Sequence, residues 1–537
     1  MSNIFQKRYK NRFFLLLLIL TFTSTIPLYF HFDSVSGQPI INRSTNTQKI
    51  ESLNPTVIVD PKPNLINNKS GDLIDNVSIA FSINATRNGT VADGLSKLLL
   101  ISNYKNPLKF SIMNNDANFS KGTLTNLTEN ANSSVSPPVK QSTIKVEPRN
   151  TSNQTPLVVA VYTPPSSVSS TTIPPNMTKG TVKIQLYDVK NSSSSTDIPI
   201  SLYRVPVVLV HGLWSDPIAS WVNTNFNKTL KEEGFNVYLA NYSAHNAETF
   251  DPHNDTKIGN YGIDSIRSII NKTLDIYQRN GTATSQVDIV GHSMGGLMAR
   301  GFVQQHDYKN PDNFMQGYIH RLITIGTPHY GGNLASILNA NKDIEYCIDH
   351  GIVLHQQTCE KKYTLKDIFA STPLKLRIDK GGVEALVPGS KAYSDMCQTN
   401  VPSYAIAASW SPNANNSYRD IQNLYRNITD NQKFDLDING FNGTTRGNND
   451  LQVNLTSQLG DLPIQWRIPN SSILPNQSEA YNNTVHYVLL YNTTDTNANW
   501  ELNSSNIKKD VALLLQSPQD KFAPSIGKDS PCKNSSG

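Results

Sequence analysis

Charged residues are scarce in this chain, and its net charge is small. Asp, Glu, Lys and Arg make up 17% of the 537 residues, and the formal net charge is +5. No long run of Lys or Arg occurs beyond the N-terminus. A nucleic-acid-binding chain usually concentrates basic residues in a patch or stripe. The composition therefore argues against a nucleic-acid partner.

Cysteine is also scarce. The chain has four, at Cys347, Cys359, Cys397 and Cys532. None of them forms a CxxC pair or stands near histidines at the spacing of a zinc site, so we predict no metal. Four cysteines can pair in three ways, and the short separation of Cys347 and Cys359 favours a disulfide between these two.

Residues 1–36 are a predicted export segment. The basic stretch "MSNIFQKRYKNR" precedes the apolar run "FFLLLLILTF", which is the layout of a secretory signal. An apolar span of about 20 residues also fits an uncleaved membrane anchor, and both alternatives stay open. In either case we expect the rest of the chain to be extracellular, either secreted or held at the membrane.

Glycosylation acceptor sites are abundant. The chain has about 27 Asn-X-Ser/Thr sequons, where its composition would give roughly 11 by chance. This excess predicts a glycoprotein. The C-terminal "SPCKNSSG" has no apolar tail, so we expect no lipid-anchor signal there.

The N-terminal third of the exported part has the pattern of short strands. Residues 37–75 are rich in Asn, Ser and Pro without periodicity, which indicates a linker. Residues 76–200 contain apolar stretches such as "LSKLLLIS", "PLVVAVYT" and "TVKIQLYDV", separated by Pro- and Ser-rich segments. Alternation in the last of these is typical of a half-buried strand. We predict an all-β accessory region, with a glycosylated stalk as the alternative.

From Val205 the pattern changes to alternating strands and helices. The run "VPVVLV" has the continuous apolar character of a buried parallel strand, and "FNVYLANY", "QVDIVGHS" and "IHRLITIGTP" are further predicted strands. Helices are predicted for "ASWVNTNFNKTLKEEG" and "GIDSIRSIINKTLDIYQRNG". This order predicts a mostly parallel sheet with helices on both faces over residues 201–517. Residues 518–537 are expected to form a C-terminal tail.

The pentapeptide Gly291-His292-Ser293-Met294-Gly295 follows a predicted strand and opens a predicted helix. This is the context of a G-x-S-x-G turn, which holds a nucleophilic serine above the end of a strand. The glycines remove side chains that would collide in so sharp a turn. Ser293 is therefore the predicted nucleophile, and a structural Gly-rich turn is the alternative.

A nucleophilic serine needs donors for the oxyanion that forms on attack. One predicted donor is the backbone N–H of Met294, directly after the nucleophile. The second is the N–H of Leu213, or of Trp214, in the loop "VHGLWSD" after an earlier strand. Predicted to line the substrate pocket are His211, Gly212, Trp214 and His292. For His211, packing of the loop is the alternative.

The general base and the acid are expected in the order Ser, acid, His. Of the histidines after Ser293, only His486 lies beyond the candidate acids. Asp450, in the polar loop "RGNNDLQVNLTSQLG", is the predicted acid, and Asp435 and Asp437 are its competitors.

Three stretches resemble the α/β-hydrolase superfamily, and within it the lipase branch with triacylglycerol lipases and GPI-inositol-deacylase-like lipases. They are "VLVHGLWSDPIASW", "VDIVGHSMGGLMAR" and "LITIGTPHYGG". "GNNDLQVNLTSQLG" is similar to that branch's acid-bearing segment, although it lacks the glycine and proline of the segment. The resemblance covers about residues 201–517. It implies an α/β-hydrolase fold with an eight-stranded type of sheet and acyl chemistry by Ser293, Asp450 and His486.

Residues 333–400 are expected to form a cap, because the superfamily commonly carries an insertion at this point. The segments "LASILNA", "YTLKDIFA" and "GGVEALVPGS" are its predicted short helices or turns. An apolar lid suits a lipid or long-chain ester. Trp214 and Trp221 are expected either in an acyl pocket or in the core.

These features predict an exported lipase or esterase that acts on a lipid or ester at a membrane surface or cell envelope, without a cofactor. An acyltransferase with the same three residues, a peptidase or amidase, and a surface binding protein with an inactive hydrolase domain are the alternatives. Some lipases of the branch bind calcium near the acid loop, where Asp435 and Asp437 stand, but our prediction contains no metal.

Overall fold

The computed structural model describes about three fifths of the chain. The described residues are 56–59, 89–114, 120–126, 141–150, 154–191, 194–252, 261–349, 352–354, 361–371, 376–409, 450, 452–453, 455–463, 465, 467–468, 481–482, 484, 486 and 500–527. The predicted export segment and most of the predicted linker lie outside them. None of the helices within these ranges is long and apolar enough to cross a membrane.

The N-terminal part is built from two β-sheets. Their strand orders are β1–β3–β8–β5, with β7 on β8, and β13–β2–β10–β9–β4–β6. The strands are β1 Thr56–Val59, β2 Gly89–Val91, β3 Leu98–Ser102, β4 Leu108–Ile112, β5 Thr123–Asn126, β6 Thr143–Val146, β7 Arg149–Asn150, β8 Pro156–Thr163, β9 Lys179–Asp188, β10 Ser195–Tyr203 and β13 Thr282–Ala283. The prediction of a β-rich N-terminal region is thereby confirmed.

The two sheets share one apolar core. In β9, Val182, Ile184 and Leu186 are buried while Lys183 between them is exposed, because successive side chains of a strand point to opposite faces. These three belong to the same cluster as Leu98 and Val158 of the other sheet. The short β13 comes from the segment that follows α6 (Tyr261–Arg279) and pairs parallel with β2, which joins this region to the rest of the chain.

The central sheet is parallel in all of its described strands, in the order β12–β11–β14–β15–β19–β21. Its strands are β11 Val207–Val210, β12 Val237–Leu239, β14 Val287–His292, β15 Ile319–Ile325, β19 Ser403–Ile406 and β21 Arg467–Ile468. The chain runs outward from β11 to β12 and then crosses back to β14. In such a sheet a ligand site is expected beyond the carboxyl ends of the strands at this switch point.

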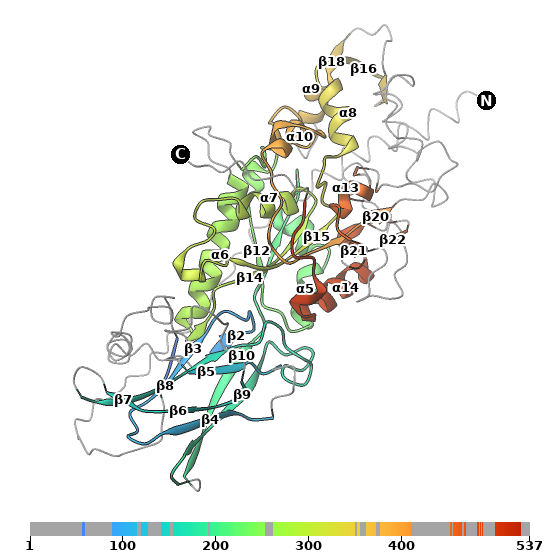
Figure 1. The fold of residues 1–537 in the computed structure, drawn as a ribbon. Helices are drawn as coiled ribbons and strands as arrows, with labels where there is room; N and C mark the ends of the chain where they lie inside the picture. The colour runs from blue at the N-terminus through green and yellow to red at the C-terminus, as the bar shows by residue number, and fades with distance from the viewer. Residues whose placement is uncertain are drawn as a thin grey trace, which may run out of the picture.

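Helices cover both faces of the central sheet (Figure 1). Val208 and Val210 of β11 face α6 and α7 (Met294–Val303). Val207 and Leu209 face the other way, toward α5 (Phe226–Glu232) and α14 (Ser505–Gln516). This arrangement confirms the predicted α/β-hydrolase fold class. Of the eight-stranded type of sheet that the resemblance implied, six strands are described.

One predicted helix is interrupted. The segment "ASWVNTNFNKTLKEEG" forms a π-helical turn, η2 Ile218–Val222, and then α5. Asn225 separates them with a φ of 59°, a left-handed conformation that asparagine tolerates better than most residues. Trp221, on η2, is fully buried and packs edge-on against Phe226, so this tryptophan belongs to the core and not to an acyl pocket.

The segment predicted as a cap lies beyond the carboxyl ends of the central strands, and the N-terminal sheets lie at the opposite end of the molecule (Figure 1). Besides the expected helical turns it contains an antiparallel sheet, β17–β16–β18, that the sequence analysis did not predict. Its elements are α8 Asn333–Asn341, β16 Glu345–Asp349, β17 Ile352–Leu354, β18 Lys362–Thr364, α9 Leu365–Ala370, α10 Gly382–Ala385 and α11 Lys391–Ser394. Strands of three to five residues are too short to show a period in the sequence.

The remaining elements are short. They are η3 Ser243–His245, η4 Pro311–Asn313, β20 Ala408–Ser409, α13 Leu455–Leu459, β22 Tyr481–Asn482, η8 Glu501–Asn503 and η9 Gln519–Lys521. Cys397 is disulfide-bonded, and the part of the chain that the structure describes contains no free cysteine. The side chains of Cys347 and Cys359, the predicted disulfide pair, lie outside the described residues.

Candidate active site

Ser293 occupies a sharp turn between β14 and α7. Its φ of 54° and ψ of −132° lie in a region that non-glycine residues rarely adopt. The backbone N–H of Ser293 donates to the carbonyl of Ile325 on the neighbouring strand at 2.9 Å. Backbone strain of this kind costs about 1–3 kcal/mol and persists only where surrounding contacts impose it.

Two glycines allow the strand and the helix to meet in this turn. A Cβ at Gly291 would lie 2.7 Å from the backbone of Gly296, and one at Gly295 would collide with the carbonyl oxygens of Val210 and His211. Because any other residue carries a Cβ, only glycine fits at these two positions without moving the backbone. The first turn of α7 therefore lies directly against the end of β11.

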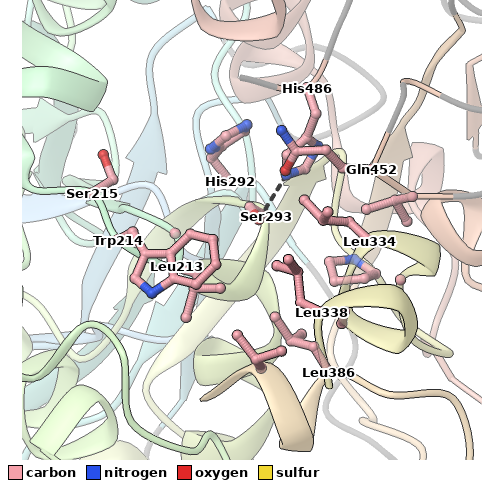
Figure 2. Close-up of a pocket in the computed structure, with 16 residues that line it drawn as sticks. Leu213, Trp214, Ser215, His292, Ser293, Leu334, Leu338, Leu386, Gln452 and His486 are labelled. Atoms are coloured by element: carbon pink, nitrogen blue, oxygen red, sulfur yellow. Dashed lines mark hydrogen bonds between the residues drawn. The ribbon is translucent and has the colours of Figure 1, made fainter. Parts of the chain in front are cut away.

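His486 connects Ser293 to Asp450. Its Nε2 lies 2.7 Å from Ser293 Oγ, and its Nδ1 lies 2.8 Å from Asp450 Oδ2. Figure 2 shows the His486 ring over Ser293 at the mouth of a pocket. The structure thus brings together the predicted nucleophile, base and acid from three distant parts of the sequence.

The carboxylate of Asp450 is held from both sides. Its Oδ1 accepts hydrogen bonds from the backbone N–H groups of Gln452 at 2.9 Å and Val453 at 2.7 Å, which leaves Oδ2 for His486. The side chain of Gln458 donates to the carbonyls of Val453 and Ala408 and so ties this loop to β20. The turn forms without the glycine and proline of the similar lipase segment. Asp435 and Asp437 lie outside the described residues.

The loop after β11 supplies the second side of the site. A Cβ on Gly212 would lie 2.7 Å from Ser293 Cβ, so only glycine lets this backbone approach the serine. The N–H of Trp214 donates to Asn246 at 3.2 Å and is therefore unavailable to an oxyanion. Within the described part of the chain, the N–H groups of Leu213 and Met294 donate to no protein acceptor. The geometry selects Leu213 over Trp214 as the second donor.

The prediction that His211 lines the pocket is wrong. Its side chain is fully buried, and its ring stacks on Tyr242 with centroids 4.0 Å apart. Its Nδ1–H donates to the carbonyl of Gly212, and its Nε2 accepts from the N–H of Tyr242. Burial lowers the pKa of His211 to about 4. This neutral histidine shapes the loop, as the alternative interpretation proposed.

Glu501 is a site residue that the sequence analysis missed. It is fully buried at the start of η8, and its Oε2 lies 3.0 Å from His292 Nε2 and 3.4 Å from His486 Nδ1. The expected order of Ser, acid and His excludes an acid that follows the histidine, and the surrounding "NWELNSS" carries no motif. No signal in the sequence points to it, because its role arises only from the folding of the C-terminal segment against the site.

The two carboxylates make His486 basic. Burial alone would lower the pKa of His486, but the negative charges of Asp450 and Glu501 outweigh burial and raise it above its usual value. Burial raises the pKa of Asp450, whereas the positive charges of the neighbouring histidines hold the pKa of Glu501 below its usual value despite burial. Glu501 is therefore the more readily ionised of the two acids.

An apolar cavity of about 50 Å³ opens beside Ser293. In Figure 2, Leu213 and Trp214 line it on one side, and Leu334, Leu338 and Leu386 of the cap line it on the other. The prediction that Gly212, Trp214 and His292 lie at the pocket agrees with this lining. The cap therefore contributes apolar side chains directly to the space where a substrate would bind.

Comparison with known proteins finds a family model that matches the central part of the chain. Residues 202–430 match the model of the PGAP1-like alpha/beta domain. This match includes the turn at Ser293, the loop after β11 and the cap, and it ends before Asp450 and His486. This match confirms the resemblance to the α/β-hydrolase superfamily. No curated protein is significantly similar to the chain.

Solved structures with a similar fold include lipases and esterases. The mature form of the Bacillus licheniformis lipase BlEst2 is 17% identical at a TM-score of 0.31, with 58% of this chain and 92% of that chain covered. Phospholipase PlaB from Legionella pneumophila is 15% identical at a TM-score of 0.28, covering 47% of this chain and 45% of that one. Esterase B from Lactobacillus rhamnosis is 15% identical at a TM-score of 0.22, covering 46% and 66%.

Proposed function

We propose that this chain, which contains a PGAP1-like alpha/beta domain of the α/β-hydrolase superfamily, is a serine hydrolase that cleaves carboxylic esters. The observation that carries the proposal is the continuous hydrogen-bond path from Ser293 through His486 to Asp450. It lies beyond the carboxyl ends of β11 and β14, at the switch point of the sheet. A surface binding protein would have no need of a strained serine held against a basic histidine.

The proposed reaction proceeds through an acyl-enzyme. Ser293 Oγ attacks the ester carbonyl as its proton passes to His486 Nε2, and the oxyanion accepts hydrogen bonds from the N–H groups of Leu213 and Met294. The C–O bond to the alcohol then breaks, and His486 returns the proton to the leaving oxygen. Water, deprotonated in turn by His486, cleaves the acyl-enzyme and regenerates Ser293.

The pocket supports an apolar acyl group as the part of the substrate bound next to Ser293. Its lining is mainly aliphatic, with contributions from the cap. A volume of about 50 Å³ holds only a few water-sized groups. A long acyl chain would therefore require α8 and α10 to move away from Trp214. We propose that the cap acts as a lid that opens toward a lipid or long-chain ester.

The experiment that tests this function measures hydrolysis of p-nitrophenyl esters of two to sixteen acyl carbons, together with labelling by a serine-directed fluorophosphonate. We expect wild type to hydrolyse the esters and to be labelled, and Ser293→Ala to do neither. Adding an excess of an acceptor alcohol separates hydrolysis from acyl transfer, because an acyltransferase would form the new ester in preference to the free acid. Folded wild-type protein that is neither active nor labelled would contradict the proposal.

Enlarging a cap side chain is expected to shorten the preferred acyl chain. Leu334 lies partly exposed at the pocket, so Leu334→Trp adds bulk where the acyl group would lie. We expect the ratio of kcat/KM for the octanoate ester to that for the acetate ester to fall by about tenfold. Leu513→Trp on the exposed face of α14, where Leu513 is 48% exposed, is the matched control. An equal ratio in both variants would show that α8 does not border the acyl site.

A further inference from the structure

The side chain of Glu501 pairs with the two histidines of the site. Its ion-pair partners within the described residues are His292 and His486, and neither a lysine nor an arginine pairs with it there. Its other oxygen, Oε1, has no hydrogen-bond partner in the described part of the chain. Burial of a carboxylate is costly unless the group is hydrogen-bonded or its charge is compensated. His292 Nε2–H donates a hydrogen bond to Glu501 Oε2 at 3.0 Å, and a positive charge that forms on His486 during the reaction would compensate the charge of this carboxylate.

The backbone is shaped to admit this carboxylate. Gly326 follows β15 with a φ of 55°, and a Cβ at this position would collide with the carboxylate of Glu501. The ring of His292 stacks on that of His486 with centroids 4.8 Å apart. Glu501 Oε2 lies 3.4 Å from Nδ1 of the His486 ring. A hydrogen bond from His292 Nε2, at 3.0 Å, holds it in this position.

We propose that Glu501 is a second acid of this site, a positioning residue that shares His486 Nδ1 with Asp450. This inference rests on the proposed function, because it concerns the same serine and histidine. Asp450 is the nearer acceptor, at 2.8 Å compared with 3.4 Å for Glu501. When the proton of Ser293 passes to Nε2, both carboxylates face the Nδ1–H of the resulting imidazolium and stabilise its charge.

A metal ion is the competing role for the same side chains. Ligand atoms of His292, His486 and Glu501 lie within 4.8 Å of one another. However, His486 Nδ1 is already engaged by Asp450 at 2.8 Å, and the contact between His292 Nε2 and Glu501 is 3.0 Å, the length of a hydrogen bond. The contacts favour a hydrogen-bonded network.

The proposal predicts a shift in the pH dependence of catalysis. Among the residues that the structure describes, the charged and titratable groups facing His486 are Asp450, Glu501 and His292. His486 can accept the serine proton only when it is neutral, and both carboxylates raise its pKa. Wild type is therefore expected to lose activity as the pH falls through this raised pKa. Removing the charge of Glu501 lowers the pKa and moves the acidic limb of kcat/KM to lower pH.

The first test is Glu501→Gln, measured as kcat/KM against pH on a short p-nitrophenyl ester. We expect the acidic limb to move down by about one pH unit or more, and Glu501→Asp to restore part of the shift because it keeps the charge. Asp510→Asn is the matched control, since Asp510 is a buried carboxylate of α14 in the same C-terminal segment. That variant is expected to keep the wild-type profile.

The second test uses the two acids together. If both carboxylates position His486, adding Glu501→Gln to the Asp450→Ala variant is expected to lower its activity by at least about tenfold. The same Glu501→Gln substitution in wild type is expected to lower activity by a smaller factor. A purely structural glutamate would give the same factor in both backgrounds. Such equality together with an unchanged acidic limb would overturn the inference.

The outcomes separate this inference from the proposed function. Wild type that hydrolyses no ester would refute the function, whereas active wild type with an unshifted Glu501→Gln profile would refute the role of Glu501 alone. Wild-type activity is expected to survive dialysis against EDTA. Activity lost on dialysis and restored by Zn²⁺ would assign the three side chains to a metal and also overturn the inference.

Discussion

His486→Ala is expected to lower kcat for a short p-nitrophenyl ester by about 10⁴- to 10⁶-fold. The reason is that His486 Nε2, at 2.7 Å from Ser293 Oγ, is the group placed to take the serine proton. Without it the hydroxyl is a weak nucleophile at neutral pH. Ser293→Ala is expected to cost about as much, and the double variant little more, because the two residues act as one unit.

The measurement is burst-corrected steady-state hydrolysis, with circular dichroism to show that the variants are folded. His306→Ala is the matched control, because His306 is an exposed histidine on the chain after α7, and it is expected to retain wild-type kcat. A His486→Ala enzyme with more than a tenth of wild-type activity would mean that another group is the base.

Asp288→Ala is expected to lower the free energy of unfolding by about 3–5 kcal/mol. Asp288 is fully buried in β14 and lies opposite Arg321 of β15. It accepts from Arg321 Nε at 3.0 Å and from His320 Nδ1 at 2.8 Å. Arg321 also donates to the carbonyl of Leu515 at 2.8 Å, so the network ties the central sheet to the last turn of α14. Removing the carboxylate would leave the guanidinium buried without a counter-charge.

Urea unfolding at pH 7 is the measurement for this variant. Asp275→Ala is the control, because the Arg279–Asp275 pair has side chains 79% and 51% exposed and exposed pairs contribute about 0–1 kcal/mol. A loss in Asp288→Ala no larger than in this control would contradict the assigned role of the network.

The effect of Asp288 is expected to depend on pH. Burial alone would raise the pKa of Asp288, but the positive charges of Arg321 and His320 outweigh burial and hold it below the usual value. A carboxylate with a lowered pKa in the folded state stabilises the fold above its unfolded pKa, about 3.9. That stabilisation is lost as the pH falls through the folded pKa. The difference between wild type and Asp288→Ala should therefore shrink below about pH 4.

Local patterns in the sequence were enough to predict the scaffold of the proposed site. The continuous apolar run at β11, which burial on both faces of a sheet demands, and its alternation with further predicted strands and helices predict a parallel sheet with helices on both faces. The glycines around Ser293 predict the sharp turn, because the absence of a Cβ is a property of the residue itself. The chain order then selects His486, whereas Asp450 is predicted from its polar loop, with Asp435 and Asp437 as competitors.

Contacts between distant segments decided the rest. Residue type alone does not distinguish the roles of His211 and His486. His211 is a structural residue because its ring packs against Tyr242, whereas His486 lies between Ser293 and Asp450. The break at Asn225 follows from the burial of Trp221 and Phe226 on two separate turns. Glu501 became part of the site because its carboxylate reaches His292 and His486 and because Gly326 leaves room for it. Residue type and spacing determine local conformation, whereas burial and the pairing of charges depend on neighbours that only the complete fold brings together.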